Sequence, residues 1–162
     1  MVKLPPRLAL SLMGLACGVS VALALLAQHK FGMEPCPWCI LQRMIFIALA
    51  VLCPLAAALP AAALRRGLSA LAVPLALGGI GAALWQHFVA AKSSSCALTF
   101  ADKIISFFGA DTRWPHVFEV RASCADAAAS ILGVPFEFWS LALFAVVGIA
   151  LIYSAVTPDR RA

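Results

Sequence analysis

Four long apolar runs constrain this chain more than any other feature of its sequence. They cover residues 8–28, 40–64, 68–91 and 136–156. About 20 apolar residues cross the hydrocarbon core of a bilayer as a helix, so each run is long enough to span a membrane. Charged residues make up 12% of the chain, which is too little to cover a water-facing surface. The sequence predicts an all-α membrane protein, a four-transmembrane-helix bundle in a single domain of residues 1–162.

Basic residues predict the orientation of this bundle. The first run has a basic front, as a signal peptide has, but it is longer than a signal peptide's apolar core and three more runs follow it, so we expect an uncleaved span. Six basic residues gather on one side of the four predicted spans: Lys3, Arg7, Arg65, Arg66, Arg160 and Arg161. By the positive-inside rule, both termini face the cytoplasm and the loops of residues 29–39 and 92–135 face the periplasm. The excess charge is thus an orientation signal, and we expect no nucleic-acid partner.

The cysteines fall into two groups. Cys17 and Cys53 lie within the first two spans, where we expect them to pack as small apolar residues. The other group, in the external loops, is Cys36, Cys39, Cys96 and Cys124. Such an even set suits a compartment that permits disulfides. A zinc site would favour a second Cys-x-x-Cys motif or a His and Cys pair, so we expect no metal and are left with structural disulfides or a redox relay.

The stretch MEPCPWCILQRM, residues 33–44, favours the relay. A Cys-x-x-Cys disulfide closes a very short loop, stabilises a fold little and exchanges readily. Arg43 follows Cys39 by four residues, on the same helical face. It is either a snorkelling side chain or a buried cation, and a cation within a membrane span marks a functional site. In the second interpretation it stabilises a thiolate at Cys39 and negative charge on an electron acceptor.

The acceptor is expected to arrive through the lipid. No domain outside the spans is large enough for a flavin or a nicotinamide, and GGIGA, residues 78–82, lacks the strand–turn–helix context of a dinucleotide site. A quinone fits a dithiol at the membrane interface.

The long loop is expected to hold two short helices. In residues 98–108, Ala101, Ile104, Ile105 and Phe108 recur at helical spacing, which predicts a helix lying on the membrane surface. Ser123 is predicted to cap a second helix over residues 124–132. Cys124 would then lie at a helix N-terminus, where the dipole favours its thiolate.

The sequence resembles the disulfide bond formation protein B (DsbB) family. The resemblance rests on CPWCILQR opening the second span, WQHF closing the third, and a cysteine pair in the long loop. It implies an enzyme of the bacterial inner membrane that reoxidises the periplasmic dithiol oxidase DsbA and passes the electrons to ubiquinone or menaquinone. It also implies the redox disulfides Cys36–Cys39 and Cys96–Cys124. Arg43 and His87 are implied to contact the quinone, although His87 also fits a simple interfacial position.

Two alternatives stay open at this point. An enzyme like vitamin K epoxide reductase uses similar chemistry, but its loop cysteines precede the Cys-x-x-Cys motif, the reverse of the order here. A non-catalytic membrane scaffold stapled by disulfides would have no use for Arg43. In the relay, DsbA attacks Cys96, the released Cys124 attacks Cys36, and Cys39 is left facing the quinone, so a Cys36–Cys124 bond is expected as an intermediate.

Overall fold

Four long helices form the body of the protein. The structure, a computed structural model, describes residues 5–92, 99–127 and 129–157. The long helices are α1 (Pro6–Phe31), α2 (Pro37–Ala58), α3 (Ala62–Phe88) and α7 (Phe136–Val156). Each is long and apolar enough to cross a membrane. The all-α bundle that the four apolar runs predict is confirmed.

The boundary between the second and third spans differs from the prediction. The second run was expected to continue to residue 64, but α2 ends at Ala58 and α3 begins at Ala62. Pro60 explains the break, because proline has no N–H to donate and disfavours helical backbone in the residue before it. Leu59 is accordingly extended, with φ −64° and ψ 125°. Arg65 and Arg66 therefore lie in the first turns of α3 rather than in the connection.

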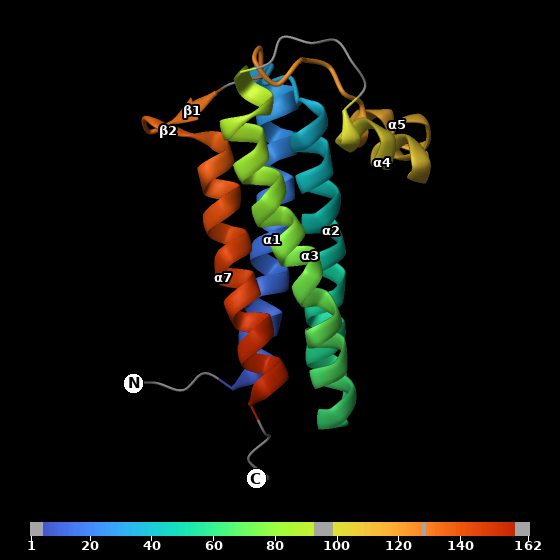
Figure 1. The fold of residues 1–162 in the computed structure, drawn as a ribbon. Coiled ribbons are helices and arrows are strands. Elements are labelled where there is room, and N and C mark those ends of the chain that lie inside the picture. The colour runs from blue at the N-terminus through green and yellow to red at the C-terminus, as the bar shows by residue number, and fades with distance from the viewer. Residues whose placement is uncertain (1–4, 93–98, 128, 158–162) are drawn as a thin grey trace.

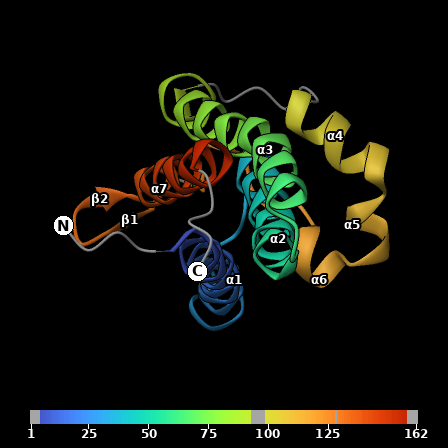
Figure 2. The same cartoon turned by 90° about the horizontal axis from the view of Figure 1, so that it is seen from below.

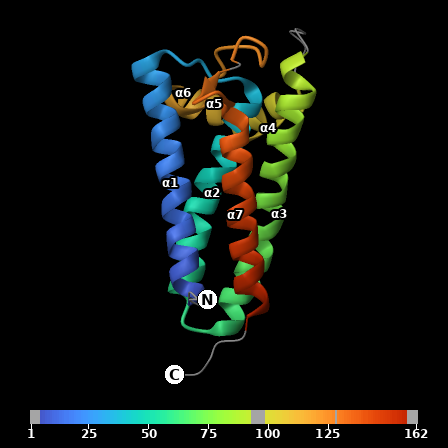
Figure 3. The same ribbon diagram turned by 90° about the vertical axis from the view of Figure 1, so that its left-hand side faces the viewer.

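The long helices close into a ring. α1 packs on α2, α2 on α3, and α3 on α7, while α7 also contacts α1. The start of α1, the α2–α3 connection and the end of α7 all lie at one end of the bundle (Figure 3). This arrangement follows from an even number of crossings. The remaining elements lie towards the opposite end, which we call the loop end (Figure 1).

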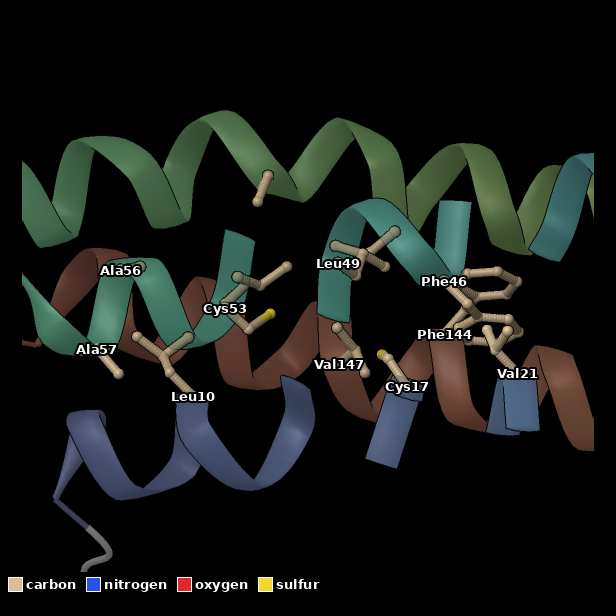
Figure 4. Packing of buried hydrophobic residues seen from close by; sticks show 13 residues of the cluster. Leu10, Cys17, Val21, Phe46, Leu49, Cys53, Ala56, Ala57, Phe144 and Val147 are labelled. Atoms are coloured by element: carbon tan, nitrogen blue, oxygen red, sulfur yellow. The ribbon is translucent and has the colours of Figure 1, made fainter. Parts of the chain in front are cut away.

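The core of the bundle runs along the inner faces of these helices. Phe46 of α2 and Phe144 of α7 stack with their ring centroids 3.9 Å apart (Figure 4). Gly79 of α3 makes room for this stack, since a Cβ there would overlap the ring of Phe144. Cys17 and Cys53 are completely buried in the same core, in the packing positions expected of them. Large apolar side chains instead cover the outside, as in a helix bundle that faces lipid: Leu15, Leu23, Leu71, Leu77, Ile149 and Ile152.

The long loop carries short elements beside the loop end of the bundle. They are a 3₁₀ turn η1 (Ala90–Lys92), three helices, α4 (Phe100–Phe108), α5 (Ala110–Arg113) and α6 (Pro115–Phe118), and two strands, β1 (Ser130–Ile131) and β2 (Val134–Pro135). Seen along the bundle, α4, α5 and α6 lie to one side, near α2 and α3, and the strands project on the other side, next to α7 (Figure 2).

The helix predicted within residues 98–108 is present as α4, but only part of its predicted apolar face is buried. Thr99 caps it in a capping box with Asp102. Ala101 and Ile105 are buried, Ile105 in a cluster with Ile40 at the start of α2. Phe108, which was expected on the same stripe, is 59% exposed. The helix thus holds the loop against α2 with one face and leaves phenylalanines exposed on another.

The helix predicted over residues 124–132 is wrong. Ser123 does cap one turn, because its Oγ accepts from the N–H of Asp126 at 3.3 Å, but the turn ends at Ala127. An antiparallel hairpin follows, in which Ile131 pairs with Val134. Leu132 and Gly133 form its tip with positive φ angles of 55° and 78°. The chain must reverse here to enter α7 at Phe136, and Gly133 permits a two-residue turn of this hand.

Candidate active site

Cys36 and Cys39 lie at the first turn of α2. Cys36 is the N-cap residue, and Pro37 follows at the first helical position, where no N–H is required. The Sγ of Cys36 accepts a hydrogen bond from the Cys39 N–H at 3.4 Å, and the two sulfurs lie 2.9 Å apart. Cys36 is completely buried, whereas Cys39 is half-buried. The helix start therefore holds the two sulfurs together and turns one of them towards accessible space.

The long loop brings Cys124 to this pair. The backbone N–H groups of Arg121 and Ala122 both donate to the carbonyl oxygen of Pro35, at 3.0 and 3.3 Å. This clamp fixes the segment before Cys124 directly beside the residue that precedes Cys36. Cys124 is buried and shares a cluster with Cys36 and Cys39. Three of the four predicted redox cysteines thus meet, while Cys96 lies outside the described residues.

The contact between Cys36 and Cys124 polarises both thiols. Its hydrogen bond raises the pKa of Cys36, an effect that a second hydrogen bond with Cys39 and burial reinforce. The same hydrogen bond lowers the pKa of Cys124. The sequence predicted that a helix dipole would favour the thiolate of Cys124. This prediction is wrong, because Cys124 begins a single turn and not a helix. In the reduced protein Cys124 is therefore disposed to be a thiolate, and Cys36 is the sulfur beside it.

Arg43 lies one turn deeper in α2 and is buried. Its Nη1 donates to Oε1 of Gln28 in α1 at 2.9 Å and to the backbone carbonyl of Val117 in α6. The side chain is 6% exposed, which is inconsistent with a snorkelling cation. Its Nε atom is buried without a hydrogen-bond partner among the described residues. One donor of the guanidinium therefore remains available to a ligand.

Two glutamines complete the surroundings of Cys39. Gln86 of α3 donates from Nε2 to the Sγ of Cys39 at 3.3 Å. Gln42 of α2 donates from Nε2 to Oε1 of Gln86 at 2.7 Å. Neither glutamine was expected at the site from the sequence. The available signal was their polarity within apolar runs, since an amide in a membrane span needs a partner.

A large apolar cavity opens beside Cys39. Its volume is about 560 Å³. α1 and α7 supply most of its walls, which include Leu23, Leu26, Phe31, Trp139 and Leu143, and the hairpin tip adds Ile131 and Leu132. Cys39, Gln42, Arg43 and Gln86 supply its polar groups. The cavity therefore combines an apolar body with a small set of polar groups around one reactive sulfur, the usual composition of a small-molecule site.

A second cavity reaches Cys39 from the loop end. Its volume is about 260 Å³, and its lining includes Gly32, Glu34 and Asp126 from the loops. Cys39, Arg43 and Gln86 line both cavities. Cys39 is thus reached from a polar side and from an apolar side.

His87 lies apart from these groups. Its Nδ1 is 2.7 Å from Oε1 of Glu137 at the start of α7, and its ring packs against Phe88 and Phe138. It is not among the residues that line either cavity. The described structure therefore does not bring His87 to Cys39, and its contact with a quinone stays a prediction.

The fold and the site define a class: a multi-pass membrane protein with a dithiol at the mouth of an apolar cavity between its helices. The sequence profile of the family described as "Disulfide bond formation protein DsbB" matches residues 6–154. The chain belongs to the DsbB family. Family membership implies oxidoreductase activity in disulfide bond formation.

Individual relatives agree with this assignment over most of their length. The chain is 37% identical to disulfide bond formation protein B of Verminephrobacter eiseniae, a match over 91% of this chain and 84% of that protein. It is 34% identical to disulfide bond formation protein B 1 of Pseudomonas putida, over 94% and 90% of the two chains. It is 30% identical to disulfide bond formation protein B of Herminiimonas arsenicoxydans, over 87% and 89%.

Proposed function

We propose that this protein is a thiol:quinone oxidoreductase of the bacterial inner membrane, with both termini cytoplasmic. It reoxidises a DsbA-type periplasmic thiol oxidase and passes the electrons to a membrane quinone, ubiquinone or menaquinone. The observation that supports this most is the row of sulfurs. Cys124 contacts Cys36, Cys36 lies 2.9 Å from Cys39, and Cys39 lines the apolar cavity.

The cavity fits a quinone by its chemistry. Its apolar walls from α1 and α7 suit a ring and an isoprenoid tail that enter from lipid. Hydrogen-bond donors for quinone oxygens are the amides of Gln42 and Gln86 and the Nε of Arg43, which has no partner among the residues that the structure describes. Bound there, a quinone would supply the acceptor for two electrons and two protons. Arg43 would hold the ring beside Cys39 and stabilise negative charge developing on its oxygens.

The cysteines carry the electrons by disulfide exchange. A thiolate of the DsbA-type partner attacks Cys96 of a Cys96–Cys124 disulfide, and Cys124 leaves as a thiolate. Cys124 then bonds to Cys36, the Cys36–Cys39 bond breaks, and its electron pair stays on Cys39. The contact between Cys124 and Cys36 supports this step, because it places the attacking sulfur beside the sulfur to which it bonds. Overall, two partner thiols become a disulfide while one quinone becomes a quinol, so electrons and protons balance.

The test is turnover of the purified chain in lipid nanodiscs with a reduced DsbA-type protein and ubiquinone-1. We expect one quinone reduced for each partner disulfide formed. Cys39→Ala should abolish quinone reduction while a mixed disulfide between the partner and Cys96 still forms, and Cys96→Ala should abolish that mixed disulfide. Cys53→Ala, in the apolar core, is the matched control and should retain turnover. Quinone reduction at the normal rate by Cys39→Ala would contradict the proposal.

A further inference from the structure

A chain of two amides ends on the sulfur of Cys39. Gln42 donates to Gln86, and Gln86 donates to Cys39, at 2.7 and 3.3 Å. Gln42 is 4% exposed and Gln86 is 6% exposed. The three side chains come from two helices, α2 and α3, that pack along each other. A buried hydrogen-bonded pair of this kind fixes both side chains in one arrangement.

The direction of these two hydrogen bonds determines which end of the Gln86 amide faces the sulfur of Cys39. An amide side chain presents either its oxygen or its NH₂ group, and the two ends have opposite polarity. Because Oε1 of Gln86 accepts from Gln42, its NH₂ group is left to point at Cys39. A donor directed at sulfur stabilises a thiolate more than a thiol or a disulfide sulfur.

Arg43 donates no hydrogen bond to the sulfur of Cys39 in the part of the chain that the structure describes. Its hydrogen bonds among the described residues go to Gln28 and to the carbonyl of Val117. The backbone N–H of Cys39 is also directed elsewhere, to the Sγ of Cys36. In the reduced protein the Cys36 thiol lies 2.9 Å from the sulfur of Cys39 and can also donate to it, but this donor is lost whenever Cys36 is in a disulfide. Gln86 is therefore the side-chain donor that the described structure places on the sulfur of Cys39 from outside the cysteine pairs.

We propose that Gln86 is a catalytic residue that donates a hydrogen bond to the Cys39 thiolate, and that Gln42 is a positioning residue that orients its amide. The inference rests on the proposed function, because it concerns the exchange described there. When Cys124 bonds to Cys36 and the Cys36–Cys39 bond breaks, the electron pair remains on Cys39, and Gln86 stabilises that charge. No atom leaves the amide, and no proton is transferred from it.

The test is the pH profile of alkylation of Cys39 in the reduced, full-length protein in nanodiscs. Iodoacetamide reacts with thiolates, and tandem mass spectrometry separates Cys39 from Cys36. Gln86→Met keeps the length of the side chain but removes the donor. Because a hydrogen bond to a charged group is lost, we expect the profile of Cys39 to move to higher pH by about one unit, or about tenfold slower alkylation at a fixed low pH. A profile that coincides with the wild-type profile would overturn the proposal.

Further variants separate a chemical role from a structural one. Gln42→Leu should move the profile in the same direction by less, and should add nothing when combined with Gln86→Met. Ser69→Ala removes another buried hydrogen bond of α3, to Ser154 at 3.1 Å, and should leave the profile unchanged. Should Gln86→Met fail to fold, Gln86→Glu decides, because a carboxylate cannot donate and its charge opposes a thiolate.

This measurement uses no quinone and no partner protein. A Gln86-dependent profile in a chain that does not reduce quinone would therefore contradict the proposed function and leave the amide donor supported. If the chain reduces quinone but the alkylation profile of Cys39 is the same with and without Gln86, the proposed function is supported and the role of Gln86 as a donor is contradicted.

Discussion

At the scale of single residues, Cys39 takes its surroundings both from neighbours in the sequence, such as Arg43, and from distant residues, such as Gln86. Arg43 follows Cys39 by four residues, so helical spacing alone indicated that the two share a face. The partners of these residues come from distant segments. Gln86 follows Cys39 by 47 residues, and its contact with that sulfur depends on how α3 packs on α2. A single sequence does not specify such packing, so the contact of Gln86 with Cys39 was not predictable.

Arg43 should control the binding of quinone. Arg43→Ala removes the buried donors at the cavity, and loss of hydrogen bonds to a charged group should raise the apparent KM for ubiquinone-1 roughly 10- to 100-fold. Arg43→Lys keeps the charge without the planar fork and should give an intermediate value. Steady-state kinetics at saturating partner protein measures both. A wild-type KM in Arg43→Ala would contradict a role for Arg43 in binding quinone and leave it a structural role through its contacts with Gln28 and Val117.

Cys124 should react as a thiolate at lower pH than an ordinary cysteine. Its pKa is lowered by the hydrogen bond from Cys36, so the thiolate persists as the pH falls until the pH reaches that lowered pKa. Cys36→Ala removes the donor and should move the alkylation profile of Cys124 in the reduced protein to higher pH.

Cys39→Ala is the control for this effect, because it retains the contact between Cys36 and Cys124. In Cys39→Ala, the alkylation of Cys124 should have its midpoint at a clearly lower pH than in Cys36→Ala. Identical profiles in the two variants would contradict the assignment of the hydrogen bond.

At the scale of secondary structure, apolar length predicted the four long helices, and proline and glycine explain most of the corrections. Pro60 ends α2 early, and Gly133 turns the chain in a hairpin where an Ala-rich segment predicted a helix. Alanine favours a helix locally, but the clamp of Arg121 and Ala122 on Pro35 fixes the start of this segment and α7 fixes its end. Local helix propensity is therefore overridden by the tertiary contacts at the two ends of the segment.

Two adjacent glycines of α3 should respond oppositely to the same substitution. A Cβ on Gly79 would overlap the ring of Phe144, whereas nothing lies within 4 Å of a Cβ on Gly78. Gly79→Ala should therefore destabilise the protein by about 1–3 kcal/mol, the usual cost of overpacking a core. Gly78→Ala should be neutral or stabilise it by up to about 1 kcal/mol, since alanine is the better helix former. Thermal unfolding in detergent measures both, and equal shifts would contradict the packing of α3 on α7.

At the scale of the whole molecule, the fold sets which parts lie at the same end of the bundle. The α2–α3 connection lies at the end opposite the site, with the start of α1 and the end of α7 (Figure 3). The four apolar runs predicted this arrangement, because an even number of spans returns the chain to the side where it began, whereas the orientation indicated by arginine and lysine stays a prediction. The hollow between α1 and α7 was not predictable, since it is formed by gaps between side chains of distant helices.

Labelling of engineered cysteines should confirm the orientation. In a chain whose native cysteines are replaced by serine, a membrane-impermeant maleimide added to intact spheroplasts should modify Ala125→Cys in the long loop. It should not modify Ala61→Cys in the α2–α3 connection until the membrane is permeabilised. Labelling of Ala61→Cys from outside would overturn the predicted topology.

The meeting of two cavities at Cys39 has a consequence for how oxidants and reductants reach the protein. One approach to this sulfur is lined by Leu23, Leu26 and Leu143, and the other by Glu34 and Asp126. An apolar molecule can therefore approach the sulfur among apolar side chains, whereas the other approach also offers two carboxylates. The sulfur of Cys39 thus lies where an apolar and a more polar environment meet, so an apolar substrate and a polar one can approach it from different sides.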